Sequence, residues 1–397
     1  MSADERARSL EQLLAAKEIV VCCGAGGVGK TTLAAAAATM AAVSLGGKVL
    51  VLTVDPARRL ADALGLEELG NVERQVPAEA FGAVEPRGEL WAAMLDTKQS
   101  WDSLVMRHAP DRRTAQRILD NALYRNISER FVQSHDYIAM ERLYEVHGSG
   151  DYDLIVVDTP PTRHALDFLE APARMADFFG SRLLRWLTVP ARSRMFTLAT
   201  RPFYSVADRI LGSQFLEDIA EFFLLFQTMH QGFVERARGV QRLLRDRRTT
   251  FVVVTTLEPA PLREAEQLAQ ALRHDHYHLG ALVLNRVLPD YLLDAEATRV
   301  AHRLYGDAPA LAAALGGADD RGDDPEVVSR VLREVGGSFL NFQVVAKRES
   351  EERAELASSP EAIVAVPYFE TDIYDVQGLL RVARATWEEE PRRAAPM

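Results

Sequence analysis

The feature that most constrains this chain is a glycine-rich segment between a short apolar run and an alanine-rich run. Residues 24–31 read Gly-Ala-Gly-Gly-Val-Gly-Lys-Thr, which matches the pattern G-x-x-x-x-G-K-[ST]. The strand-like run EIVVCC precedes the segment, and the helix-like residues 32–42 follow it. Glycines let backbone N–H groups curl around a polyphosphate, and a helix start adds partial positive charge. The alternative is a turn that merely joins strand to helix; the agreement of motif and context favours a phosphate loop.

Two side chains of this loop carry the expected chemistry. We expect Lys30 to bridge the β- and γ-phosphates of ATP, and the Thr31 hydroxyl to bind Mg²⁺. The chain has only five lysines against 41 arginines, so a lysine at position 30 is notable. The residues expected to contact the nucleotide here are Gly26, Gly27, Val28, Gly29, Lys30, Thr31 and Thr32.

Two aspartates follow apolar runs and are candidates to complete the site. Asp158 ends the run LIVVD, where a second Mg²⁺ ligand of a phosphate-loop enzyme belongs. Asp55 follows the run KVLVLTV and could orient an attacking water. Either aspartate alone could instead cap the next helix. Two such positions beside one phosphate loop favour the functional interpretation.

The hydrophobic pattern predicts a doubly wound, mostly parallel α/β sheet with an inserted helical subdomain, because continuous Val/Ile/Leu runs alternate with helical stretches. The predicted strands are 19–23, 49–54, 90–95, 154–158, 250–256, 281–286 and 363–366. The predicted domains are a discontinuous ATPase domain (1–96, 151–170 and 249–390), a helical subdomain (97–150 and 171–248) and a flexible tail (391–397). A further helical stretch, 291–357, contains a polar break at 316–324 that we expect to be a loop.

Composition excludes several classes of function. The net charge of −11 over 397 residues argues against a nucleic-acid binder. The only cysteines, Cys22 and Cys23, are adjacent, so they can form neither an ordinary disulfide nor a four-cysteine zinc site. No signal peptide and no apolar run of membrane-spanning length is evident. We therefore expect a cytoplasmic protein, peripheral to a membrane at most.

Three segments together resemble the ArsA-type ATPases, a deviant Walker-A family that includes arsenite-pump ATPases and factors that target tail-anchored membrane proteins. They are 24–32, 55–62 (DPARRLAD) and 158–164 (DTPPTRH), similar to its phosphate loop, switch I and switch II; LVLNRV and AVPYFE also match. The resemblance implies that Lys30 and Asp55 are catalytic, with Asp55 polarising the attacking water, and that Thr31 and Asp158 hold Mg²⁺. It also implies that Asn285 recognises adenine, that Pro367 and Phe369 lie in the adenine-side loop, and that the protein dimerises around two nucleotides.

The chain also departs from this family. Its members usually carry, at the position of Ala25, a lysine that reaches the partner's phosphates, so a homodimer of this chain is expected to hydrolyse ATP slowly. Arg58, Arg59 or Arg163 could replace that cation, or a lysine-bearing paralogue could supply it in a heterodimer; the alternative is that these arginines are solvated. The zinc-clasp and metalloid-sensing cysteines of the family are absent, so neither zinc nor arsenite activation is expected.

The helical insertion could bind a hydrophobic client or a membrane-associated partner. Residues 175–235 hold nine of the sixteen phenylalanines, and residues 172–248 carry 13 arginines against 7 acidic residues. This composition fits an exposed hydrophobic groove surrounded by basic residues, or the ordinary hydrophobic core of a helical lobe.

Three functions remain open at this point. The first is a Mg²⁺-dependent ATPase that acts as a dimeric switch. The second is a nucleotide-holding regulatory or carrier subunit with little hydrolysis of its own. A partition-type positioning ATPase is a weaker third.

The histidine-rich segment HDHYH, 274–278, is interpreted as a surface turn rather than as a metal site.

Overall fold

One eight-stranded sheet organises the molecule, in the order β3-β4-β2-β5-β1-β6-β7-β8. All neighbouring strands pair in parallel except β3, which runs antiparallel to β4 at one edge. The strands are β1 (Ile19–Cys23), β2 (Lys48–Thr53), β3 (Arg74–Gln75), β4 (Glu89–Met94), β5 (Leu154–Asp158), β6 (Thr249–Thr255), β7 (Leu279–Val287) and β8 (Ala362–Pro367). The predicted mostly parallel α/β sheet is thus confirmed, and every predicted strand is present with ends that differ by no more than two residues.

The structure is a computed structural model. It describes residues 10–54, 59–121, 124–125, 132–159, 174, 221–222, 224–225, 228–316, 324–356 and 362–387. Several sequence predictions fall outside these residues: the positions of Asp55, Arg58 and Arg163, most of the phenylalanine-rich segment 175–235, most of the polar break 316–324, and the tail 391–397.

The strand order places the glycine-rich loop where the crossover connections between parallel strands switch from one side of the sheet to the other. From β1 the chain crosses to β2 and β4 and returns to β5, beside β1; it then continues through β6, β7 and β8 on the other side. In open parallel sheets, ligands bind outside the carboxyl ends of the strands at such a switch point. The loop that follows Cys23 lies at this point.

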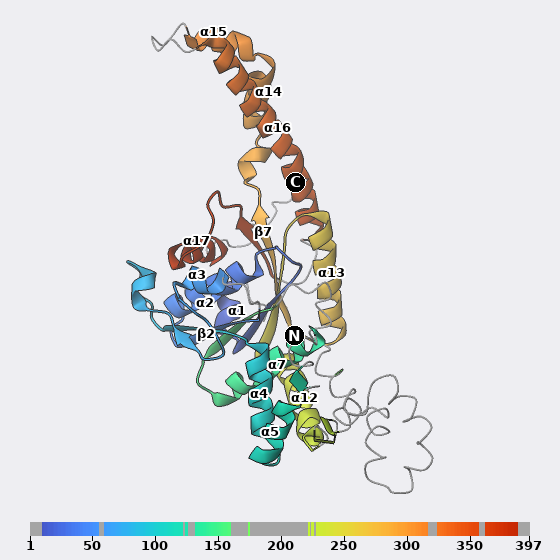
Figure 1. The fold of residues 1–397 in the computed structure, drawn as a ribbon. Coiled ribbons are helices and arrows are strands. Elements are labelled where there is room, and N and C mark those ends of the chain that lie inside the picture. The colour runs from blue at the N-terminus through green and yellow to red at the C-terminus, as the bar shows by residue number, and fades with distance from the viewer. Residues whose placement is uncertain are drawn as a thin grey trace, which may run out of the picture.

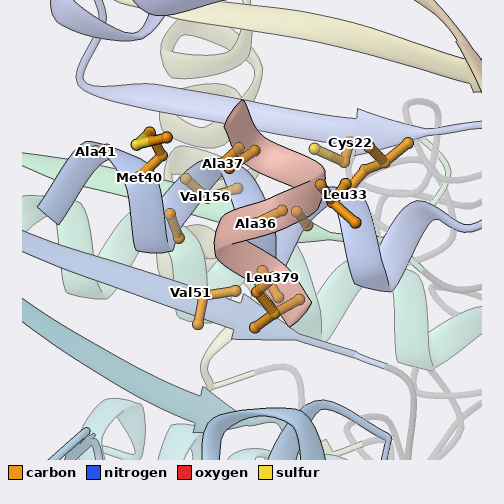
Figure 2. Close-up of a cluster of buried hydrophobic side chains, with 14 of the residues drawn as sticks. Cys22, Leu33, Ala36, Ala37, Met40, Ala41, Val51, Val156 and Leu379 are labelled. Atoms are coloured by element: carbon orange, nitrogen blue, oxygen red, sulfur yellow. The ribbon is translucent and has the colours of Figure 1, made fainter. Parts of the chain in front are cut away.

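Helices cover both faces of the sheet (Figure 1). One face carries α1 (Leu10–Ala15), α2 (Lys30–Ser44), α3 (Arg59–Leu64) and α17 (Val376–Trp387). Figure 2 shows the core of this face, where Ala37 of α2 gathers with Val51, Val156 and Leu379 from β2, β5 and α17. The alanines of α2 are buried on every side of the helix, and their small side chains let it lie close to the sheet.

The other face carries α4 (Thr97–His108), α5 (Arg112–Asp120), α7 (Val132–Ser149), α12 (His230–Arg245) and α13 (Pro259–His274). Where the structure describes residues 97–150, it shows helices and no strand, as predicted. Trp101 of α4 and Val240 of α12 belong to the same buried cluster as Ile19 and Leu50 of the sheet. This helical layer therefore shares one hydrophobic core with the strands.

A helical arm extends from the end of β7, away from the sheet (Figure 1). It consists of the short 3₁₀ helix at Asp290–Leu293, then α14 (Ala295–Gly306), α15 (Ala308–Gly316) and α16 (Pro325–Leu356), in agreement with the helical pattern of 291–357. Although α16 has 32 residues, neither it nor any other helix in the described ranges combines the length and the hydropathy that crossing a bilayer requires.

A buried ion pair between α7 and α12 yields a prediction about stability. Glu141 is 3% exposed and pairs with Arg236; burial raises the pKa of its carboxyl group, while Arg236 opposes that rise. Replacement Arg236→Met leaves a buried carboxylate without this partner, which costs about 3 kcal/mol of unfolding free energy. The folded-state pKa of Glu141 then lies further above its unfolded value, so the loss is greatest at neutral pH and shrinks as acidification protonates the carboxyl group.

Urea denaturation at pH 7 and pH 5 measures this effect. Arg238→Met, an exposed change on the same helix, is the matched control and is expected to cost under about 0.5 kcal/mol. Equal losses for the two variants, or a loss for Arg236→Met that does not depend on pH, would contradict the assignment.

Candidate functional site

The glycine-rich loop joins β1 to α2, and two of its glycines are required by geometry. Gly24 has φ 148°, and a Cβ on it would lie 2.1 Å from the carbonyl oxygen of Val254 in β6. Gly29 has φ 93° in the left-handed region, where it is the N-cap residue of α2 and has no side chain to occupy the first N–H groups of that helix. The exposed residues between them, Gly26 and Gly27, leave the loop open to an anion.

Lys30 folds back over this loop. Its Nζ donates a hydrogen bond to the carbonyl oxygen of Ala25 at 2.7 Å, and the residue is 5% exposed. Thr31 and Thr32 are half-buried in the first turn of α2. The loop thus gathers one buried cation and the start of a helix around a short stretch of main chain, an arrangement suited to binding phosphate groups.

Asp158 lies at the carboxyl end of β5, directly beside β1. It is fully buried, and its Oδ2 accepts a hydrogen bond from the Thr53 hydroxyl at 2.9 Å. The next residue, Thr159, donates from its hydroxyl to the carbonyl oxygen of Cys22 at 2.9 Å. The pKa of the Cys22 thiol is raised by burial and by Asp158 and lowered by Lys30, so both charges act on the end of β1.

The donor set fits Mg²⁺. A threonine hydroxyl and a carboxylate are hard oxygen ligands, and Mg²⁺ in phosphate-loop sites takes few protein ligands and keeps phosphate oxygens and waters. Among the residues that the structure describes, no three or more His, Cys, Asp or Glu side chains gather as a metal site. Thr31 and Asp158 are the residues that carry such oxygen ligands in the first turn of α2 and at the end of β5.

Asn285 lies near the end of β7, which pairs with β8. The Asn285 side chain contacts the phosphate loop directly, because its Nδ2 donates to the carbonyl oxygen of Val28 at 2.7 Å. Val287 is paired with Pro367, and its carbonyl oxygen accepts a hydrogen bond from the N–H of Tyr368 at 2.9 Å. Pro367 and Phe369 are half-buried at this edge of the sheet.

Two contacts among these residues were not predicted from the sequence. The Thr53 hydroxyl at the end of β2 was not singled out, although a polar residue that closes an apolar strand was a usable signal. The Asn285–Val28 contact joins residues 257 positions apart, and no local sequence pattern predicts it.

Asp55 lies outside the described residues, two positions beyond Thr53, and Arg59 is exposed at the start of α3.

Comparisons with known proteins point to one family. A family model described as anion-transporting ATPase matches residues 17–304. The chain is 26% identical over 271 residues to a putative arsenical pump-driving ATPase 2 of Aquifex aeolicus, covering 67% of this chain and 79% of that protein. It is 26% identical over 293 residues to the ATPase GET3A of Arabidopsis thaliana, covering 73% of each chain. It is 27% identical over 295 residues to the ATPase GET3 of Malassezia globosa, covering 72% of this chain and 78% of that protein.

The two thiols beneath the loop are predicted to be unreactive. Burial raises the pKa of Cys23 to about 12 and holds the pKa of Cys22 well above its ordinary value. A raised pKa keeps both thiols protonated at pH 8, and the protonated form is a poor nucleophile. Ellman's reagent should therefore titrate no thiol in the native protein and two per chain in guanidinium chloride. Rapid modification of the folded protein would contradict this burial.

Proposed function

The chain belongs to the anion-transporting ATPase family, and on this basis we propose that it is a nucleotide-driven switch whose loop from Gly24 to Thr31 holds the triphosphate of ATP. Family membership makes the protein an ATPase. The observation that supports this site most strongly is the folded loop itself, with Lys30 buried within it and Asp158 at the end of the neighbouring strand.

Each residue has a role in this proposal. Lys30 exchanges the Ala25 carbonyl for phosphate oxygens, which its charge binds more strongly. Thr31 and Asp158 would hold Mg²⁺, which supplies positive charge to the phosphoryl oxygens when it is bound. Asp55 orients the attacking water. Asn285, Pro367 and Phe369 border the adenine, with Gly26, Gly27, Val28, Gly29 and Thr32 along the phosphates.

We also propose that the working unit is a dimer. Ala25 is buried and has no charge to offer across an interface, so a homodimer lacks the cation that the family usually places there. Arg58, Arg59, Arg163 or a lysine-bearing paralogue would have to supply it. The helical subdomain, 97–150 and 171–248, is the part that would respond to nucleotide and accept a hydrophobic client or membrane-associated partner, while 1–96, 151–170 and 249–390 form the ATPase domain.

Ala25 also favours a second candidate function. A chain that binds ATP but lacks the charge for rapid hydrolysis fits a regulatory or carrier subunit paired with a related ATPase. The rate of ATP hydrolysis by the purified chain, alone and with such a paralogue, separates the two candidates. Hydrolysis that appears only with the paralogue favours the subunit.

Lys30→Ala and Asp158→Asn test the site. We expect each variant to lower the rate of ATP hydrolysis about 100-fold, because Lys30→Ala removes a positive charge that stabilises the transition state and Asp158→Asn removes a carboxylate that would hold Mg²⁺. Asp158→Asn should still bind ATP without Mg²⁺, whereas Lys30→Ala should bind it weakly under all conditions. Hydrolysis is followed by phosphate release, and binding by calorimetry. Lys98→Ala, which changes a half-exposed lysine on α4, is the control and should behave as the unchanged protein does. Full activity in Lys30→Ala would refute the proposed site.

Asp55→Asn tests the proposed catalytic role of that residue separately from binding. If Asp55 orients the water, the hydrolysis rate falls about 100-fold while ATP affinity stays within about twofold, because ground-state binding is not involved. Asp62→Asn, an exposed change in α3, is the matched control. Parallel loss of affinity and rate would instead assign Asp55 to nucleotide binding.

A further inference from the structure

The end of β7 contains an irregularity that faces the phosphate loop. Its pairing with β8 shifts register between Leu284 and Val287, so Asn285 and Arg286 form a bulge. Arg286 has φ 59°, in the left-handed region that residues other than glycine rarely adopt. A bulge of this kind re-aims a side chain, and here the re-aimed side chain is that of Asn285.

The Asn285 amide bridges this bulge and the loop. Its Oδ1 accepts a hydrogen bond from the backbone N–H of Arg286 at 2.9 Å, and its Nδ2 donates to the carbonyl oxygen of Val28 at 2.7 Å. An N–H can only donate and a carbonyl can only accept, so these two partners fix the orientation of the amide. Gly29 is also constrained by this contact, because a Cβ there would lie 2.3 Å from Nδ2.

We propose that Asn285 is a positioning residue for the phosphate loop, beyond any contact it makes with adenine. In a trans peptide the C=O of one residue and the N–H of the next point in opposite directions. By holding the Val28 carbonyl on the β7 side, Asn285 turns the Gly29 N–H to the opposite side of that peptide. The inference rests on the proposed binding of phosphate at this loop, and it names the residue that orients one of the loop's donors.

This role leaves room for adenine recognition. The amide retains one further N–H and one further lone pair after its two contacts with the chain. The two roles make different predictions for a ligand that has phosphates but no base. A residue that only recognises adenine cannot change the binding of that ligand, whereas a residue that orients the loop must change it.

The test uses magnesium tripolyphosphate, ATP and GTP with the full chain. Calorimetry is expected to show that Asn285→Ala weakens binding of tripolyphosphate about 5- to 10-fold, the usual effect of one lost hydrogen bond, and weakens binding of ATP by at least that factor. Asn285→Asp keeps the size but sets a carboxylate against the Val28 carbonyl, so its loss should be larger. Unchanged tripolyphosphate binding with weakened ATP binding and a reduced preference for ATP over GTP would overturn the proposal in favour of adenine reading alone.

A second pair of variants tests the bulge without touching the amide. Arg286→Gly keeps the left-handed backbone at no steric cost and should bind tripolyphosphate as the unchanged protein does, whereas β-branched Arg286→Val strains it and should weaken binding. Thermal melting confirms that each variant is folded, and equal binding by both would count against the proposal. If the unchanged protein binds neither tripolyphosphate nor ATP, the proposed function itself fails, and that result is distinct from a selective failure of Asn285.

Discussion

The candidate site depends on how the short stretch of main chain between β1 and α2 is held in shape. Such a loop has to satisfy its carbonyl oxygens elsewhere, because an unpaired buried carbonyl is costly. Two of them are satisfied by side chains: Ala25 by the Lys30 ammonium, and Val28 by the Asn285 amide. Gly24 completes the arrangement, because only a residue without a Cβ can approach the β6 backbone this closely.

The parallel sheet brings these groups together from distant parts of the sequence. Carboxyl ends of parallel strands meet at one edge, so β2, β5 and β7 each bring a polar group, Thr53, Asp158 and Asn285, to the edge where the glycine-rich loop follows β1. Thr53 and Asp158 are register partners in neighbouring strands, and their hydrogen bond follows directly from that pairing. Once the strand order is set, the composition of the site is largely a consequence of which residue ends each strand.

The sequence was sufficient for features that repeat locally and insufficient for contacts between segments. Apolar runs predicted seven strands, and the G-x-x-x-x-G-K-T pattern predicted the loop, because both are visible within ten residues. The two-residue β3 was missed because it is too short to show any alternation. Helical periodicity predicted helices in 291–357 but not an arm that leaves the sheet, since periodicity carries no information on direction. The family resemblance points to Asn285, but its bond to Val28 depends on a bulge, and a bulge has no signature in one sequence.

The same bulge connects the phosphate loop to the arm. Three positions after Asn285, the N–H of Leu288 donates to Oε2 of Glu349 in α16 at 3.1 Å, and burial raises the pKa of that carboxyl group. Between them, the Val287 carbonyl accepts the N–H of Tyr368 beyond β8. Three residues within four positions, Asn285, Val287 and Leu288, are thus hydrogen-bonded to the phosphate loop, to the residue that follows β8 and to α16. The Val28 carbonyl that accepts from Asn285 belongs to the peptide plane that also carries the Gly29 N–H, and the contact with α16 follows three residues after Asn285. The loop and the arm are therefore linked by a short covalent path with a hydrogen bond at each end.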